Sequence, residues 1–255
     1  MWAIGLSMLA LALLHRLPLL LLAAIGAAIV GGHNGLAGVA FAPDTWAASA
    51  WTILEQRGNL MYDPVRVRIS YPLLAWIGVI LLGYACGPLY ARGMPAAQRR
   101  RWLMLAGVAG LLLLALLRTW NVYGEPLPWA PHETLLRSAM SWLNFTKYPP
   151  SLDFLLLTLG VGLLVLAWIE RIDAGWVRIA AVFGGAPLFF YIAHLYLLLV
   201  AQRVAAFVLD LPRVDVGHVW QVWLGSVLLA LLLYWPTKRF GRYKRESGKA
   251  WVKYL

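Results

Sequence analysis

The chain has 255 residues, of which 62% are hydrophobic and only 13% are charged, and its formal net charge is +11. Soluble domains are about 45–50% apolar and about 25% charged, so this composition excludes an ordinary soluble domain and predicts a polytopic membrane protein. The single cysteine, Cys86, can form no intrachain disulfide. The sequence contains no glycine-rich phosphate loop, zinc-ligand spacing or nucleophile elbow.

Seven apolar segments predict an all-α fold, a polytopic transmembrane helical bundle, because helices satisfy every backbone polar group in lipid. The first segment is short for a span, which needs about 20 residues. We expect a transmembrane domain over residues 1–236 and a basic tail over residues 237–255. In chain order the segments are residues 1–14, 17–32, 71–90, 102–120, 151–169, 179–209 and 216–235.

The basic residues predict the orientation of the bundle. More than half of the 22 Lys and Arg residues lie in the tail and in alternate connections, such as residues 91–101. The positive-inside rule places these segments, and hence the C-terminus, in the cytoplasm, with the bundle in a bacterial inner membrane. The long connections 33–70 and 121–150 then face outward. Connections of this length are often functional.

The apolar run over residues 179–202 contains no Asp, Glu, Lys or Arg and a single histidine, His194. A histidine at this depth usually faces a polar cavity or a protein partner. Tyr191 shares a helix face with His194, and Arg203 follows at the outer end. This face predicts a polar path through the bundle. The alternatives are a bond from His194 to a neighbouring helix and an Arg203 that snorkels to the interface. Pro187, after two glycines, predicts a helix break.

Three stretches, residues 70–88, 144–160 and 183–198, resemble bacterial members of the heparan-α-glucosaminide N-acetyltransferase catalytic-domain family. They occur in the family's order, and the resemblance covers nearly the whole chain. The resemblance implies a membrane acyltransferase that takes an acetyl group from cytoplasmic acetyl-CoA, a co-substrate rather than a bound cofactor. The acetyl group passes to an amine or hydroxyl of a sugar across the bilayer. The resemblance makes His194 the candidate catalytic base or oxyanion donor.

Two basic groups are candidate ligand contacts. Arg99, Arg100 and Arg101 form the nearest cytoplasmic cluster for the CoA phosphates, although the positive-inside rule explains them without a ligand and is the favoured explanation. Lys147 and Tyr148 lie at the outer membrane edge, where they contact either an anionic acceptor or lipid headgroups. The expected partners are the lipid bilayer and an amino-sugar or glycan acceptor, with oligomers possible, no nucleic acid and no metal.

The sequence departs from the family pattern in its first helix. Members open with a Leu-Asp-x-x-Arg-Gly helix followed by Asp-His, and neither motif occurs in this chain. The departure predicts an N-terminally truncated, inactive copy. Two other classes stay open: a small-molecule transporter or flippase-like protein lined by His194, Tyr191 and Arg203, and a structural membrane subunit without enzymatic activity. The sequence has no duplicated segment of the kind that many transporters carry, which weakens the transporter hypothesis.

The predicted orientation can be tested by thiol labelling. On a Cys86→Ser background, we expect Glu133→Cys to react with a membrane-impermeant maleimide in intact cells, and Ser247→Cys to react only after permeabilisation. The opposite pattern, with the tail labelled in intact cells and residue 133 protected, reverses the topology.

Overall fold

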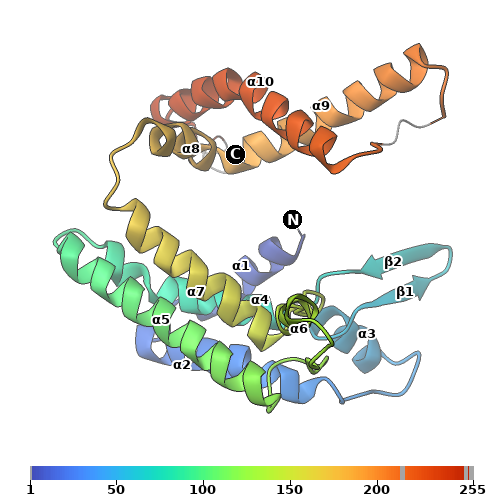
Figure 1. Ribbon diagram of the computed structural model, residues 1–255, viewed down its shortest axis with the longest axis vertical. Helices are drawn as coiled ribbons and strands as arrows, with labels where there is room; N and C mark the ends of the chain where they lie inside the picture. The colour runs from blue at the N-terminus through green and yellow to red at the C-terminus, as the bar shows by residue number, and fades with distance from the viewer. Residues whose placement is uncertain (1, 213–215, 250–251, 253–255) are drawn as a thin grey trace. The chain divides into compact units, whose positions relative to one another are not determined.

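The computed structural model describes residues 2–212, 216–249 and 252, and it divides the chain into two compact units, Met1–Glu170 and Arg171–Leu255. Figure 1 shows that most of it is helical, which confirms the predicted all-α class. The described residues also contain a small hairpin in which β1 (Gly58–Tyr62) pairs antiparallel with β2 (Val65–Ile69). Met1 and part of the predicted tail lie outside the described residues.

Unit 1 contains four apolar helices that pack as two antiparallel pairs, with α2 against α4 and α5 against α7. A fifth helix, α1, packs against α4. Shorter elements occupy the connections between these helices. The bounds in unit 1 are α1 (Trp2–Leu14), α2 (Leu19–Gly32), η1 (His33–Leu36), α3 (Trp46–Leu54), α4 (Leu74–Ala85), η2 (Gly87–Tyr90), α5 (Ala96–Trp120), α6 (Leu135–Trp142) and α7 (Leu152–Ile169).

Glycines allow both helix pairs to approach closely. A Cβ atom on Gly26 of α2 would lie 2.9 Å from the Gly78 carbonyl oxygen of α4. A Cβ on Gly107 of α5 would lie 2.9 Å from the Gly160 carbonyl oxygen of α7. Lipid provides no hydrophobic drive between helices, so close van der Waals packing at small residues holds such pairs together.

The antiparallel packing brings helix termini together at each of the two ends of unit 1. The C-terminal ends of α2 and α5 lie at the same end as the N-terminal ends of α4 and α7, as the bond from Leu152 N to Asn34 illustrates. The long connections 33–70 and 121–150 therefore meet at this end, which we call the loop end. Tyr90, Arg99 and Glu170 meet at the other end.

The sequence predicted seven spanning segments, and this number is too high. Among the described residues, five helices are long and apolar enough to cross a membrane: α2 with η1, α5, α7, α9 and α10. The first and third predicted segments form only α1, with 13 residues, and α4, with 12. At 1.5 Å per residue such helices are about 20 Å long, against a hydrocarbon core of about 30 Å.

Unit 2 consists of α8 (Gly175–Gly185), α9 (Pro187–Val208) and α10 (Val219–Glu246). The predicted helix break is confirmed, because α8 ends at Gly185 and Pro187 begins α9. Aromatic contacts join the helices: the rings of Phe189 and Phe240 stack with centroids 4.4 Å apart. α10 continues through Pro236 for ten residues beyond the predicted end of the transmembrane domain.

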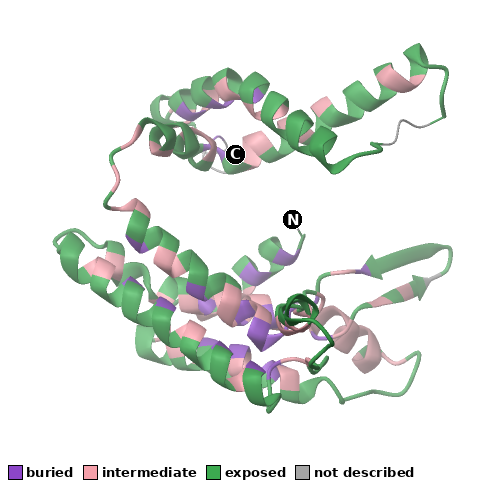
Figure 2. Ribbon diagram, viewed as in Figure 1, coloured by how far each residue is buried: buried purple, intermediate pink, exposed green. Residues whose placement is uncertain are grey.

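Large apolar side chains cover the outer faces of both units. Figure 2 shows that exposed positions predominate in both units, and no residue of α9 is buried. A soluble protein rarely exposes apolar surface on this scale, so these faces fit a lipid environment. The chain is therefore a multi-pass membrane protein by helix length, composition and surface.

The role of the glycine contacts can be tested within one helix. Gly107→Ala places a methyl group against the backbone of α7, whereas Gly110→Ala meets its nearest atom at an ordinary 3.8 Å. Both substitutions raise helix propensity by about 1 kcal/mol. We expect Gly107→Ala to lower the thermal unfolding midpoint in detergent and Gly110→Ala to keep or raise it. Equal midpoints for the two variants would contradict the packing role of Gly107.

Candidate functional site

A buried arginine organises the second long connection at the loop end. Arg118 lies in the last turn of α5 and is only 2% exposed. Its guanidinium donates to four backbone carbonyl oxygens at 2.8–3.0 Å and lies 5.3 Å from the centre of the Phe145 ring. The acceptors are the carbonyls of Leu127, Ser141, Trp142 and Asn144. Arg118 thus ties both arms of this connection to the end of α5.

Glu125 stabilises the same connection through hydrogen bonds to other residues of its own segment. Its carboxylate accepts hydrogen bonds from the Thr146 backbone and hydroxyl and from the Ser151 hydroxyl. Ser151 also caps α7, since its hydroxyl accepts from Phe154 N at 3.1 Å. Both oxygens of Glu125 therefore accept hydrogen bonds from the segment that leads into α7.

The two long connections meet through His33 and its neighbours. His33 is buried at the end of α2, and its Nε2 donates to the Pro150 carbonyl at 2.8 Å. Asn34 accepts from Leu152 N at 2.8 Å, and the Tyr123 hydroxyl accepts from Gly35 N at 3.0 Å. These bonds join segments more than 80 residues apart in the sequence.

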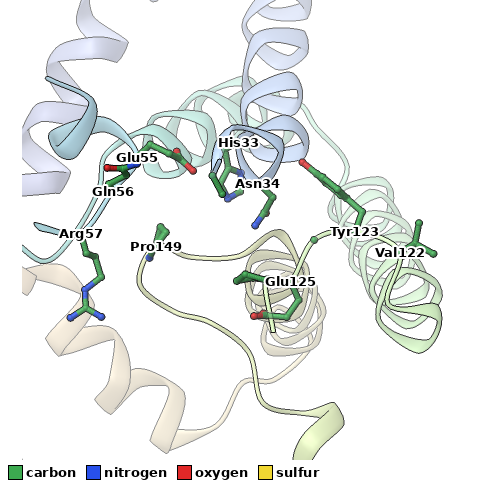
Figure 3. Close-up of a pocket in the computed structure, with 12 residues that line it drawn as sticks. His33, Asn34, Glu55, Gln56, Arg57, Val122, Tyr123, Glu125 and Pro149 are labelled. Carbon is green, nitrogen blue, oxygen red and sulfur yellow. The ribbon is translucent and has the colours of Figure 1, made fainter. Parts of the chain in front are cut away.

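A cavity of about 560 Å³ lies between the joined connections. Figure 3 shows its wall formed by the end of α2 and η1, the end of α3, and the segments around Tyr123 and Pro149. Its volume lies within the range of about 300–1,000 Å³ typical of small-molecule sites. The lining residues are His33, Asn34, Ala37, Glu55, Gln56, Arg57, Val122, Tyr123, Gly124, Glu125, Pro126 and Pro149.

Glu55 differs from Glu125 in having a free carboxyl group. It directly follows α3, is 3% exposed and lines the cavity. None of the described residues hydrogen-bonds its carboxyl oxygens. Burial raises the pKa of Glu55 to about 7. The group therefore changes charge near neutral pH, which is the property expected of a proton-accepting or amine-binding carboxylate.

Cations and phenols gather at one side of the cavity. The guanidinium of Arg57 lies 5.5 Å from the centre of the Tyr148 ring, and the Lys147 ammonium lies 5.3 Å from it. The hydroxyls of Tyr148 and Tyr71 are 3.2 Å apart. This hydrogen bond from Tyr71, together with the neighbouring Lys147, lowers the pKa of Tyr148. The predicted pair Lys147 and Tyr148 therefore lies beside Arg57, a cavity-lining residue.

A second carboxyl group without a hydrogen-bond partner lies beneath the cavity wall. Asp153, in the first turn of α7, is fully buried, and neither of its oxygens has a hydrogen-bond partner in the described residues. Gly124, with a φ of +101°, fits over it, because a Cβ there would lie 2.5 Å from an Asp153 oxygen. Gly124 thus meets two requirements for glycine, a positive φ and a close approach.

The predicted CoA-binding arginines lie at the opposite end of unit 1. Arg99 forms an ion pair with Glu170 at 2.8 Å and lies 5.1 Å from the centre of the Tyr90 ring. Arg100 is half-buried, and Arg101 is exposed. Arg99 already has a protein partner, so Arg101 is the more accessible of these cations.

The predicted polar path lies in unit 2. His194 is half-buried, its Nδ1 donates to the Phe190 carbonyl at 3.0 Å, and it contacts the Phe190 and Tyr191 rings. Tyr191 and Arg203 are exposed on α9. The hydrogen bond of His194 stays within its own helix. Its predicted catalytic role is not tested by this geometry and stays a prediction.

Comparisons with protein-family models, with curated proteins and with solved structures find no match to this chain. Within residues 2–212, 216–249 and 252, no group of three His, Cys, Asp or Glu side chains could hold a metal ion. The argument for function therefore rests on the cavity and its neighbours.

The sequence alone did not identify two important residues of this site, Arg118 and Glu55. Arg118 stands at the end of an apolar run, where an arginine normally snorkels to the headgroups. Glu55 is one of several polar residues in a long connection, and nothing in its neighbourhood distinguishes it. A charged residue inside the last turn of a predicted span is the one signal that could have indicated Arg118.

We expect Arg118→Met to destabilise the loop end. The substitution leaves four carbonyl groups without their charged donor, and each such bond contributes about 1.5–3 kcal/mol. The free energy of unfolding in mixed detergent micelles should fall by at least about 2 kcal/mol, and protease sites in residues 121–150 should open. Arg137→Met on the exposed face of α6 is the matched control and should change stability by less than about 0.5 kcal/mol. Indistinguishable variants would show that Arg118 does not hold the connection.

Proposed function

We propose that this chain is a membrane protein of the sugar acetyltransferase type and that the loop-end cavity binds the amino group of an amino-sugar acceptor. The observation that carries the proposal is the free, buried carboxyl group of Glu55 in the cavity wall. A carboxylate without an internal partner suits the ammonium group of a ligand. The positive-inside rule supports an outward-facing cavity in a bacterial inner membrane.

The other lining groups suit a hydroxylated ligand. Asn34, Gln56 and Tyr123 offer amide and phenol groups around the cavity, and Arg57 adds a cation at one side. Small-molecule sites typically combine an apolar wall with a few such fixed polar groups. Glu125 is a weaker candidate for ligand binding, because its oxygens already accept hydrogen bonds from Thr146 and Ser151.

Acyl transfer would require the acceptor nitrogen to lose a proton before or during its attack on the thioester carbon. A carboxyl group with a pKa of about 7 is suited to accept that proton at neutral pH. The sulfur of CoA then leaves as the carbon–sulfur bond breaks and the new carbon–nitrogen bond forms. The resemblance assigns His194 the base or oxyanion role, and the cavity adds Glu55 as a second candidate for the proton.

Binding of glucosamine tests the acceptor site on the chain as it is. Glu55 becomes ionised as the pH rises through about 7, so we expect glucosamine to bind several-fold more tightly at pH 7.5 than at pH 6, measured by calorimetry in detergent. N-acetylglucosamine, which lacks the ammonium, should bind more weakly at pH 7.5. Glu55→Gln should abolish the pH dependence, whereas the matched control Glu133→Gln, in an exposed loop, should retain it. Equal affinity of Glu55→Gln and wild type at both pH values would refute the assignment.

The same preparation tests the reaction. The chain is incubated with labelled acetyl-CoA and glucosamine, and the formation of N-acetylglucosamine is measured. Formation of N-acetylglucosamine that depends on His194 or Glu55 would show that the chain is catalytically competent. Movement of glucosamine into proteoliposomes without acetylation would favour the transporter hypothesis over the acyltransferase one.

A further inference from the structure

Unit 2 contains an apolar groove whose residues belong to α8 and α10. Its volume is about 440 Å³. Most of its lining side chains are aliphatic or aromatic, and several are more than half exposed, including Leu231 and Trp235. The lining residues are Ile179, Phe183, Val227, Ala230, Leu231, Tyr234 and Trp235.

A cation lies against the aromatic side chains of this groove. The Lys238 ammonium is 5.1 Å from the centre of the Trp235 ring and 5.7 Å from that of Tyr234. Arg239 and Arg242 follow within the next turns of α10, and both are exposed. Arg178, next to Ile179 on α8, already pairs with Asp173 at 2.8 Å. The free positive charge beside the groove therefore comes mainly from α10.

We propose that this groove binds one anionic phospholipid, with an acyl chain along the groove and the phosphate at Lys238. The continuous helix α10 passes from an apolar half to a basic half at Trp235, an arrangement typical of a helix that leaves the bilayer core at the headgroup level. Basic clusters next to a spanning helix attract anionic headgroups. The lining residues all belong to unit 2, and the proposal does not rest on the acceptor cavity.

Charge complementarity favours a lipid over the other possible occupants. A second copy of this chain would bring the same basic segment to the groove, and the like charges would repel each other. An uncharged partner helix would cover the apolar residues and leave Lys238 without a counter-ion. An anionic phospholipid supplies both an apolar acyl chain for the groove and a negative phosphate for Lys238. The two parts lie in the bilayer core and at its surface, as the groove and Lys238 are expected to do.

Native mass spectrometry of the full chain in detergent can test the site with two defined lipids, dioleoyl phosphatidylglycerol and dioleoyl phosphatidylcholine. We expect the wild-type chain to retain phosphatidylglycerol preferentially. Lys238→Gln should reduce this preference about fivefold. Arg92→Gln, which removes one exposed charge from a connection in unit 1, is the matched control and should leave the preference unchanged.

The apolar part of the site is tested by filling the groove. Ala230→Phe should reduce retention of phosphatidylglycerol, whereas Ala201→Phe, at an exposed position of α9, should not. If Ala230→Phe fails to fold, Ile179→Trp fills the groove from α8. The proposal is overturned by equal retention of the two lipids in the wild type. It is also overturned if Lys238→Gln matches Arg92→Gln, or if a folded groove-filling variant binds phosphatidylglycerol as the wild type does.

Discussion

The loop end of unit 1 depends on the hydrogen bonds of one buried guanidinium. Arg118 stands at the end of an apolar helix, where a cation must reach water, a counter-ion or a full set of acceptors. It has four backbone carbonyl acceptors from the connection 121–150. A lysine could not replace it, because three donors on a flexible stem cannot match the planar fork of the guanidinium. The connection therefore folds over the end of the bundle, and Glu125 and Tyr123 are carried to the cavity as a consequence.

The glycine contacts set the geometry in which this connection can meet the other one. The Nε2 atom of His33 lies 2.8 Å from the carbonyl oxygen of Pro150, because the end of α2 and the start of α7 lie at the same end of unit 1. This arrangement is fixed by the antiparallel pairs, which approach until backbone carbonyls meet Gly26 and Gly107. A side chain at either glycine would push the paired helices apart and displace the connections at the loop end. The shape of the polar cavity therefore depends on the packing of the apolar helices.

The sequence predicted the helical class and the break before Pro187, because apolar runs and proline act locally. It overestimated the spans, since apolar composition over residues 71–90 did not reveal that α4 ends at Ala85. The cavity could not be predicted, because it depends on bonds between residues far apart in the chain, such as His33 and Pro150. His194 attracted attention by its apolar surroundings, whereas Glu55 gains its unusual pKa only from burial that the fold creates.

The two carboxyl groups of the cavity show why Glu55, rather than Glu125, is the functional candidate. Glu125 is half-buried and accepts hydrogen bonds from Thr146 and Ser151, so its carboxyl group serves the fold. Glu55 lies at the same end of the bundle without any such bond in the described residues, and its burial disfavours the charged form and raises its pKa to about 7. Neutralisation by a proton relieves this unfavourable burial of charge below about pH 7, and a cationic ligand would relieve it above. A group that gains stability from either a proton or an amine is chemically matched to a reaction in which an amine gives up a proton.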